Sequence, residues 1–355
     1  MIESAANTST YLAIHMSSFT TPVLLTHCQH LAVFCASGAD TTTFLQSQLT
    51  QDIGLVSPTQ SALAGFCTAQ GRLWATMLLT QAEQSQDQNQ TQSQPQGLTM
   101  VGVAAADVME TFLKRLRMFV MRSKVTITAS AELKVYGVQL AAGDFGSFAS
   151  QFTGDIAQEP WASATTPDGT WLKLPSANSD VVRLLWLTAP AHFDQLIATL
   201  GNQAQLLPAP AAWQIQDIQA GLPWVEAASQ DLFIGQTLNL DLIGGVSFTK
   251  GCYPGQEVIA RAHYRGTVKR RMHLATIKAD ESDVSPGMDI FDANEPDNPV
   301  GRLINVADDP TVTGQIWALF EAPFKALSGS PLRAGSATGP ELIELSLPYQ
   351  IVSQP

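Results

Sequence analysis

The alternation of apolar and polar residues divides the N-terminal third of the chain into short strands. An apolar run at 31–36 predicts a buried strand, and a second run at 73–79 follows the tetrapeptide Ala-Gln-Gly-Arg at 69–72. Glycine in such a tetrapeptide is typical of a hairpin turn. We therefore expect the run at 73–79 to pair with the residues that precede the turn.

Apolar residues three and four positions apart predict three helices. The first extends over about 106–121, with its apolar stripe running from 108 to 116 and basic residues gathered near its end. Positive charge there complements the negative end of the helix dipole. A second helix is expected at 190–200. A third begins after Pro210, and its pattern places Trp213 away from the buried face.

Strands and helices mixed in this way predict the α+β class, with two α+β domains followed by an antiparallel β-barrel. The segment at 81–97 is almost entirely Gln, Ser, Asn and Asp, which predicts a disordered loop. The expected divisions are a flexible leader at 1–25, a first domain at 26–124, a second domain at 125–249, a motif and basic strand at 250–270, and the barrel at 271–355.

The composition indicates a globular cytoplasmic protein, which we expect to be a monomer. The chain has 355 residues, of which 45% are hydrophobic, and a formal net charge of −12. Like charges repel, so this protein is not expected to bind nucleic acid or an anionic membrane with its whole surface. Its four cysteines are too few for a disulfide framework at this length, which favours a reducing compartment. Neither a targeting segment nor a bilayer-spanning apolar run is found.

The densest chemistry lies in the octapeptide Lys-Gly-Cys-Tyr-Pro-Gly-Gln-Glu at 250–257. Its Pro-Gly step at 254–255 is typical of a type II turn, because glycine supplies the positive φ that the second central position needs. Residues 256–264 are then expected to form a strand with one charged face. That face would carry Glu257, Arg261 and His263.

The thiol of Cys252 is the candidate reactive group of this motif. Nearby cations lower the pKa of a thiol, so Lys250 and Arg261 would favour the thiolate. The alternative is that Cys252 is an inert small residue in a turn. The other motif positions assigned to the candidate site are Gly251, Tyr253, Gly255, Gln256 and Glu257.

Two other kinds of site are disfavoured by the sequence. The run His27-Cys28-Gln-His30 offers potential zinc ligands together with Cys67, but a second paired ligand set is missing, so no metal site is predicted. Scattered cysteines also argue against a self-contained iron–sulfur cluster. Five cations at 261–271 raise the alternative of direct RNA contact, which the net charge of −12 argues against.

Over most of its length the chain resembles the folate-binding YgfZ proteins, relatives of the T-protein (aminomethyltransferase) of the glycine cleavage system. The resemblance is densest from Trp213 to Pro223 and in the octapeptide at 250–257. Further matching stretches are Asn239-Leu-Asp241, Gly244-Gly-Val-Ser-Phe248, Gly38-Ala-Asp, Gln46-Ser-Gln48, Ala69-Gln-Gly-Arg-Leu-Trp74 and Leu347-Pro-Tyr349.

The resemblance implies a three-domain ring whose central channel admits tetrahydrofolate. It also implies an accessory protein that supports the assembly or repair of iron–sulfur enzymes, including tRNA-modifying ones, with such enzymes or assembly proteins as partners. Trp213 stands where the family places a tryptophan against folate. Leu31 stands where an aromatic residue is expected.

An alternative implied by the same relationship is a folate-dependent, aminomethyltransferase-like transfer of a one-carbon group. The T-protein carries an Asp-Asp pair just after its Gly-Gly turn, and a carboxylate there is needed for catalysis. Ala75 and Thr76 occupy the matching positions of this chain, which argues against that mechanism. Whether the protein turns over a substrate is left open by these residues.

Overall fold

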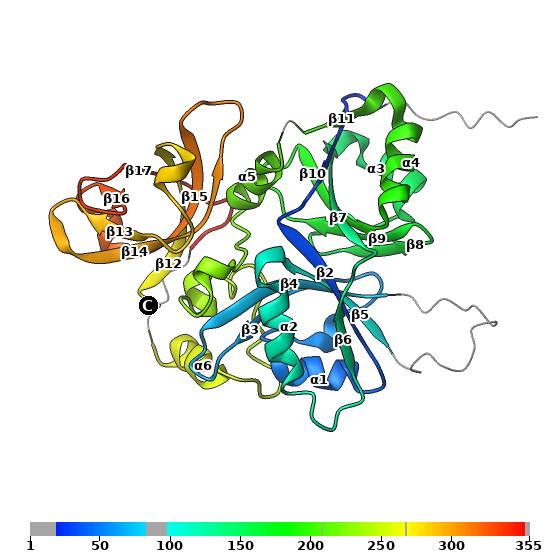
Figure 1. Ribbon diagram of the computed structural model, residues 1–355, viewed down its shortest axis with the longest axis horizontal. Coiled ribbons are helices and arrows are strands. Elements are labelled where there is room, and N and C mark those ends of the chain that lie inside the picture. The colour runs from blue at the N-terminus through cyan, green and yellow to red at the C-terminus, as the bar shows by residue number, and fades with distance from the viewer. Residues whose placement is uncertain (1–18, 83–97, 208, 267, 352–355) are drawn as a thin grey trace, which may run out of the picture.

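Three β-sheets with flanking helices make up the structure. The computed structural model describes residues 19–82, 98–207, 209–266 and 268–351. In Figure 1 the first sheet lies low, the second to its upper right and the third to its upper left. The expected α+β class is confirmed. Most of the predicted leader and nearly all of the predicted disordered loop fall outside the described residues.

The first sheet is antiparallel throughout, in the order β3-β4-β5-β2-β6. Its strands are β2 (Leu31–Ser37), β3 (Ala62–Cys67), β4 (Leu73–Gln81), β5 (Thr99–Ala105) and β6 (Thr126–Ala129). Its helical segments are α1 (Thr41–Gln48), η1 (Ile53–Leu55), η2 (Ala106–Val108) and α2 (Met109–Arg117). The predicted strand at 31–36 and the hairpin turn at 69–72 are confirmed.

Helix α2 packs its apolar stripe against this sheet. The ring of Phe112 meets Phe34 and Phe66 edge-on, with centroids 5.4 and 5.6 Å apart. Its last turn carries basic side chains on the solvent side, as the helix dipole favours. The helix ends at Arg117 rather than near 121, and Met121 then takes a left-handed φ of 38°.

The second sheet has the order β11-β1-β7-β10-β9-β8 and is parallel only between β1 and β11. Its strands are β1 (Val23–His27), β7 (Lys134–Ala141), β8 (Ser163–Thr166), β9 (Gly169–Leu174), β10 (Val181–Thr188) and β11 (Ala204–Leu206). The accompanying helical segments are η3 (Ala142–Asp144), α3 (Phe145–Phe148), η4 (Ala149–Thr153), α4 (Pro190–Leu200) and η5 (Gly201–Gln203). The helix predicted at 190–200 is confirmed.

Strand β1 corrects the expected leader at 1–25. Val23 and Leu25 are fully buried, and β1 pairs along its length with β7. The strand has only five residues, and the Ser- and Thr-rich residues around it masked its apolar pattern in the sequence. The chain therefore enters the second sheet first and crosses to the first sheet through the short turn before β2.

The connecting region holds α5 (Ala211–Gln219), η6 (Ala227–Ser229), η7 (Gly235–Leu238) and α6 (Gln256–Tyr264). Helix α5 lies between the second and third sheets (Figure 1). This position corrects the expectation for Trp213, which is fully buried and not turned away from the core. Its ring packs on β7 at Gly137, where an added Cβ would come within 2.4 Å of the ring.

Helix α6 corrects the strand expected at 256–264. Gly255 adopts a left-handed φ of 82°, and the amide of Ile259 donates to its carbonyl over 3.3 Å, which starts a helix. Ile259 is the one fully buried side chain of α6. A single buried position fits a surface helix as well as a strand, so the alternation of apolar residues did not distinguish the two.

The third sheet is antiparallel, in the order β16-β13-β14-β15-β12-β17. Its elements are β12 (Arg270–Lys278), η8 (Glu281–Asp283), β13 (Asp289–Asp292), β14 (Glu295–Asp308), β15 (Gln315–Pro323), α7 (Phe324–Leu327), β16 (Leu332–Ala334) and β17 (Leu342–Leu345). The predicted antiparallel barrel is confirmed in part, because the sheet is antiparallel and curled but remains open. Its edge strands are too short to complete a ladder, and one isolated bridge, between Arg333 and Glu341, links the two edge regions within the described residues.

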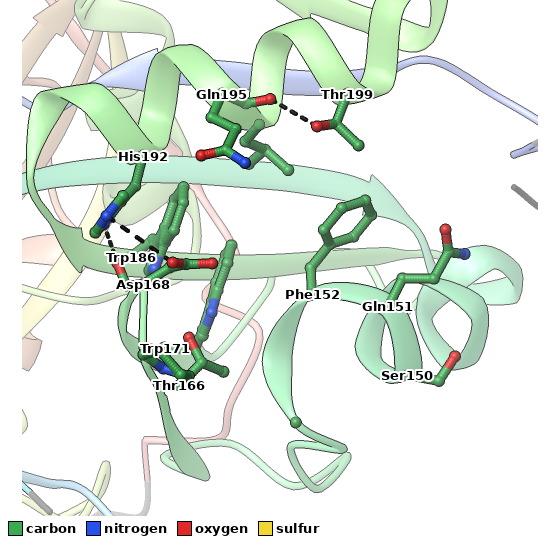
Figure 2. Close-up of a pocket in the computed structure, with 13 residues that line it drawn as sticks. Ser150, Gln151, Phe152, Thr166, Asp168, Trp171, Trp186, His192, Gln195 and Thr199 are labelled. Carbon is green, nitrogen blue, oxygen red and sulfur yellow. Dashed lines mark hydrogen bonds and ion pairs between the residues drawn. The ribbon is translucent and has the colours of Figure 1, made fainter. Parts of the chain in front are cut away.

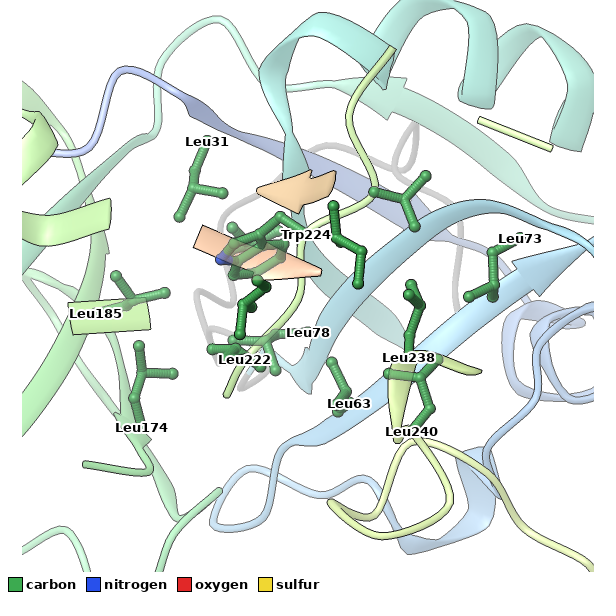
Figure 3. Packing of buried hydrophobic residues seen from close by; sticks show 14 of the residues in the cluster. Leu31, Leu63, Leu73, Leu78, Leu174, Leu185, Leu222, Trp224, Leu238 and Leu240 are labelled. Carbon is green, nitrogen blue, oxygen red and sulfur yellow. The ribbon is translucent and has the colours of Figure 1, made fainter. Parts of the chain in front are cut away.

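A shared hydrophobic core joins the three sheets. Its side chains come from β2 and β4, from β9 and β10, and from β12, β14 and β15, with the segment after α5 between them. Figure 3 shows Leu222 and Trp224 between Leu31, Leu174 and Leu185 on one side and Leu63, Leu73, Leu238 and Leu240 on the other. Each sheet also has a separate core on its outer side. None of the helices in the described ranges has the length and apolarity that a membrane crossing requires.

A buried ion pair lies where α5 meets the second sheet. Arg183 of β10 and Asp217 of α5 are 1% and 2% exposed, and the guanidinium donates directly to the carboxylate. The guanidinium carbon also lies 4.7 Å from the centre of the Trp213 ring. The indole of Trp224 donates to the second carboxylate oxygen over 3.0 Å. Burial acts to raise the pKa of Asp217, but the charge of Arg183 and the hydrogen bonds outweigh it and hold that pKa below its usual range.

Removing the carboxylate by Asp217→Ala should destabilise the protein by about 3–5 kcal/mol, because Arg183 is left as an unpaired buried charge. The double variant Arg183→Met/Asp217→Leu should recover most of the loss. Since the pKa of Asp217 is lowered on folding, its contribution is complete above about pH 4 and fades as the pH falls further. Urea unfolding at pH 7 measures these effects, and a single-variant loss below about 1 kcal/mol would contradict the expectation.

Candidate functional site

Two turns from distant parts of the sequence pack against each other at the octapeptide. Gly71 of the β3–β4 hairpin has φ of 74°, and Gly255 has φ of 82°. A Cβ on Gly255 would lie 2.5 Å from the Cα of Gly71 and 2.5 Å from the carbonyl oxygen of Thr68. Only glycine fits such a contact, and the positive φ agrees with the predicted type II turn. The structure thus brings together two of the stretches that the sequence singled out.

The ammonium of Lys250 anchors the octapeptide to the first sheet. The side chain is 8% exposed, and Nζ donates to the carbonyl oxygens of Gln46, Leu49 and Gln51 at the end of α1. Burial lowers the pKa of Lys250 to about 8, against the attraction of the Asp52 carboxylate. These contacts give Lys250 a structural role at the helix terminus, where its charge meets carbonyl groups left without helical partners.

Cys252 is exposed on the loop between these two anchors. The other three cysteines lie in less accessible places, where burial raises their pKa values: Cys28 far above the usual range, Cys67 to about 12 and Cys35 less strongly. A buried neutral thiol is a poor nucleophile. Cys252 is therefore the cysteine best placed to react with a partner molecule.

Helix α6 distributes the remaining motif residues over its surface. Glu257 and Arg261 are exposed and lie one turn apart on the helix. His263 stacks on Phe248 with ring centroids 3.7 Å apart. Glu257 and His263 are six positions apart in the helix, which places them on different sides of it rather than on one strand face. Tyr253 is buried, Gln256 is half-buried, and Gly251 is exposed.

A cleft of about 550 Å³ opens where the three sheets meet. The turn before β2 contributes His30, η2 contributes Asp107, and the segment after α5 contributes Trp224 and Glu226. Residues of η8 and β14 close the side that faces the third sheet. The charged side chains of the lining are the carboxylates of Asp107, Glu226, Glu281 and Asp308.

Glu226 is the most strongly perturbed acid in this cleft. Burial raises its pKa to about 7, aided by the negative charge of Asp107 and opposed by a hydrogen bond from the Asn305 amide. That amide lies 2.7 Å from Oε1 of Glu226 and also binds the Trp224 carbonyl at 2.8 Å. A half-buried carboxyl group that titrates near neutrality in a cleft is typical of a binding or proton-transfer site.

His30 supplies a second polar group with unused bonding capacity. Both ring nitrogens are buried and have no hydrogen-bond partner among the described residues. The imidazole lies beside the charged side chain of Asp217, whose Oδ2 is 3.9 Å from Nε2 of His30. The imidazole helps to lower the pKa of Asp217, and a buried ring nitrogen left without a hydrogen bond costs free energy unless a ligand satisfies it. His30 and Glu226 together make the cleft suitable for a ligand with both donors and acceptors.

Thr76 explains why the carboxylate of the T-protein has no counterpart here. Its hydroxyl donates to the Pro223 carbonyl at 3.1 Å and accepts from the Val225 amide at 2.9 Å. The Thr76 hydroxyl therefore makes both of these hydrogen bonds to the segment that carries Trp224 and Glu226. Ala75 next to it is completely buried. These two positions hold the backbone of the cleft in place and offer no acid.

The two positions expected to contact folate lie behind the cleft lining. Trp213 is fully buried on α5, where its neighbours Ala211 and Gln214 line the cleft. Leu31 is 5% exposed and follows directly after His30. Their contact with folate stays a prediction.

The sequence did not reveal Glu226, Asn305 or Asp107, since their pairing depends on contacts between separate sheets. Within the described residues, no cluster of three or more acidic, histidine or cysteine side chains is arranged to hold a metal ion.

Comparison with known proteins identifies the family. The chain is 32% identical over 261 residues to the tRNA-modifying protein YgfZ of Sodalis glossinidius, covering 73% of each chain. It is 31% identical over 257 residues to the protein of that name from Escherichia coli O157:H7, covering 72% of each. The chain belongs to the YgfZ family. No family model matches the chain.

The YgfZ chain described here also shares the fold of a solved aminomethyltransferase. The glycine cleavage system aminomethyltransferase T of Bartonella henselae superposes with a TM-score of 0.67 at 14% identity, over 92% of this chain and 86% of the other. That level of identity shows a common fold. Together with the curated relatives, this confirms the resemblance to the YgfZ proteins and to the T-protein fold.

Alkylation should distinguish Cys252 from the other cysteines. We expect iodoacetamide at pH 7.5 to modify Cys252 first in the native protein, because the other thiols are buried or hindered and poorly ionised. Mass spectrometry of peptides after short reaction times measures the order. Unfolding in urea should make the four rates similar. Faster labelling of Cys28, Cys35 or Cys67 in the native protein would refute this assignment.

Proposed function

We propose that this YgfZ protein binds a reduced folate in the cleft between its three sheets. We further propose that it serves as an accessory protein for the assembly or repair of iron–sulfur enzymes, among them tRNA-modifying ones. The observation that carries the folate proposal is Glu226, a carboxyl group with a pKa of about 7 facing a cleft of suitable size. Family membership and the transferase fold support it further.

The bicyclic head of a folate suits this lining. Its aminopyrimidine edge presents adjacent N–H donors, which a carboxylate such as Glu226 accepts in pairs. His30 offers further hydrogen bonding, and the indole of Trp224 forms an apolar wall. When bound, a reduced folate supplies a carrier for one-carbon groups. The residues of this chain hold and orient it.

The carboxylate tail of the folate belongs outside the cleft. The lining carries four carboxylates and no lysine or arginine, so it repels an anionic tail. The head would therefore enter first, and the tail would extend toward solvent. Basic side chains of the protein surface, such as those at the end of α2, are candidates to meet it.

The alternative of aminomethyl transfer has the fold in its favour and the site against it. A transfer that needs a carboxylate beside the folate would have to use one of the four cleft carboxylates, such as Glu226, since Thr76 and Ala75 carry none. Direct RNA contact through 261–271 is also weakened. Arg270 is paired with Glu321 and Arg271 with Asp241, so the exposed cations of that stretch are Arg261, Arg265 and Lys269.

Cys252 would provide the link to client enzymes. The thiol lies on an exposed loop held by Lys250 on one side and by Gly255 on the other. A thiolate is a soft ligand for iron and a good nucleophile toward an oxidised sulfur of a partner. Either contact requires the accessibility that this cysteine has.

Folate binding should depend on pH through Glu226. In isothermal titration with 5-formyltetrahydrofolate, we expect about tenfold tighter binding at pH 8 than at pH 6, because the ligand selects the ionised carboxylate of a group with a pKa of about 7. Glu226→Gln should weaken binding and abolish the pH dependence.

Glu281→Gln is the matched control, since Glu281 is an exposed carboxylate of the same cleft. It should leave both affinity and pH dependence nearly unchanged. Absence of heat at millimolar ligand would disprove folate binding altogether. Binding that Glu226→Gln does not alter would place the folate elsewhere.

The role of Cys252 can be tested in cells that lack their own YgfZ. Cys252→Ala should leave the melting temperature and folate affinity nearly unchanged, because an exposed thiol buries little area. It should nevertheless abolish the support of an iron–sulfur enzyme, measured as that enzyme's activity in extracts. Cys252→Ser should fail as well, since a hydroxyl stays protonated. Cys35→Ala is the control, and full activity with Cys252→Ala would overturn the proposed role.

A further inference from the structure

A second cavity, of about 380 Å³, lies in the second sheet beneath α4. Figure 2 shows Trp171 and Trp186 side by side on its floor, with His192, Gln195 and Thr199 of α4 above them. Phe152 of η4 lies farther along the cavity. None of the cleft residues discussed above lines it. The cavity belongs to a different part of the molecule from the octapeptide and the folate cleft.

The two tryptophans form a fixed stacked pair. Trp171 of β9 and Trp186 of β10 are opposite each other in the ladder, and their rings stack with centroids 4.5 Å apart and planes at 6°. Phe148 packs edge-on against Trp171 at 5.8 Å. The exposed fractions of the two tryptophans are 1% and 3%. Their positions are therefore set by the sheet and do not depend on a ligand.

Both indole N–H groups of this pair lack an acceptor. Nε1 of Trp171 and Nε1 of Trp186 are buried and have no hydrogen-bond partner among the described residues. An unsatisfied buried donor costs about 1–3 kcal/mol. Trp74 and Trp213 also have unpartnered indole nitrogens, but Trp171 and Trp186 are the pair that shares the lining of one cavity, where a ligand could supply the acceptor.

Gly169 lies in the turn that packs on one of these donors. Its φ is 141°, and a Cβ there would lie 2.9 Å from Nε1 of Trp186 and 2.5 Å from the Leu187 carbonyl oxygen. Any other residue at this position would place carbon against the indole N–H. The turn therefore packs closely on Trp186 but supplies no acceptor to its indole N–H.

The mouth of the cavity carries one acid and one histidine. Nδ1 of His192 lies 2.9 Å from the carbonyl oxygen of Asp168, and Nε2 lies 3.9 Å from its carboxylate. The Thr188 hydroxyl is 3.1 Å from Nδ1. No lysine or arginine lines the cavity. Without a fixed cation, and with Asp168 at the mouth, the cavity does not suit a phosphate or a carboxylate.

We propose that this cavity is a binding site for a small, neutral, planar compound of the amide or lactam class. Its carbonyl oxygen would accept from the indole N–H groups of Trp171 and Trp186, and its apolar ring would pack on Phe152 and the tryptophan pair. Its own N–H would face the carboxylate of Asp168, because the carbonyl oxygen of that residue already has the Thr188 hydroxyl and His192 Nδ1 as partners. The site is independent of the proposed folate cleft.

Indole resonances provide a direct test, with benzamide as the probe. In a spectrum of protein labelled with ¹⁵N-tryptophan, each of the seven tryptophans gives one indole signal, assigned by Trp→Phe variants. We expect saturable downfield shifts of the Trp171 and Trp186 protons as benzamide is added, because each acquires an acceptor. Trp74 and Trp213 are matched controls, since their indole nitrogens are also buried and unpartnered but do not line this cavity.

Toluene and benzoate separate the contributions of ring, carbonyl and charge. Toluene should leave the indole protons without a downfield shift, and benzoate should bind more weakly than benzamide. Trp186→Phe should weaken benzamide binding about tenfold, the equivalent of one hydrogen bond, whereas Trp74→Phe should not. If Trp186→Phe fails to fold, the wild-type titration alone decides. No shift at either indole, or equal shifts at Trp74 and Trp213, would overturn the proposal.

Discussion

The buried pair of Arg183 and Asp217 fixes how the three sheets meet. It ties β10 of the second sheet to α5, and α5 in turn packs on β14 and β15 of the third. Neither charge can be moved without exposing the other to an apolar interior. The cation also covers the ring of Trp213, so the helix is held in both its position and its rotation. Every wall of the junction cleft is placed relative to this helix.

Trp224, which lines the cleft, is hydrogen-bonded to this ion pair. Its indole donates to Asp217, its amide and carbonyl bind the Asn305 side chain, and the residue after it is held by Thr76. The short segment 223–226 is thus fixed by the first sheet, by the third sheet and by α5. Glu226 at its end is half-buried, and the Asn305 amide donates to its Oε1 over 2.7 Å. This explains how a half-buried acid with a raised pKa is maintained at a surface opening.

Local patterns predicted the parts of the fold that local energetics decide. The hairpin at Gly71, helix α4 and the turn at Gly255 depend on residues close in sequence, and each was predicted. The strand predicted at 256–264 is in fact helix α6. The prediction was wrong because one buried residue, Ile259, cannot distinguish a repeat of two residues from one of 3.6. Glu226 was missed for a different reason. Its pKa is raised by burial between sheets and by the charge of Asp107, against a hydrogen bond from Asn305, about 80 residues away in sequence, and no local pattern contains that information.

Different residues of the octapeptide have different roles, some anchoring the loop and one exposing a thiol. Its charged lysine and its cysteine are two residues apart, which in the sequence indicates one reactive unit. In the structure the ammonium of Lys250 is directed into the carbonyl groups at the end of α1, and Gly255 packs on Gly71 from the other side. Both ends of the loop are therefore fixed to the first sheet, and Cys252 between them is held at the surface. A thiol that must meet a large partner needs a defined position and open access, and the two anchors supply both without contributing any chemistry of their own.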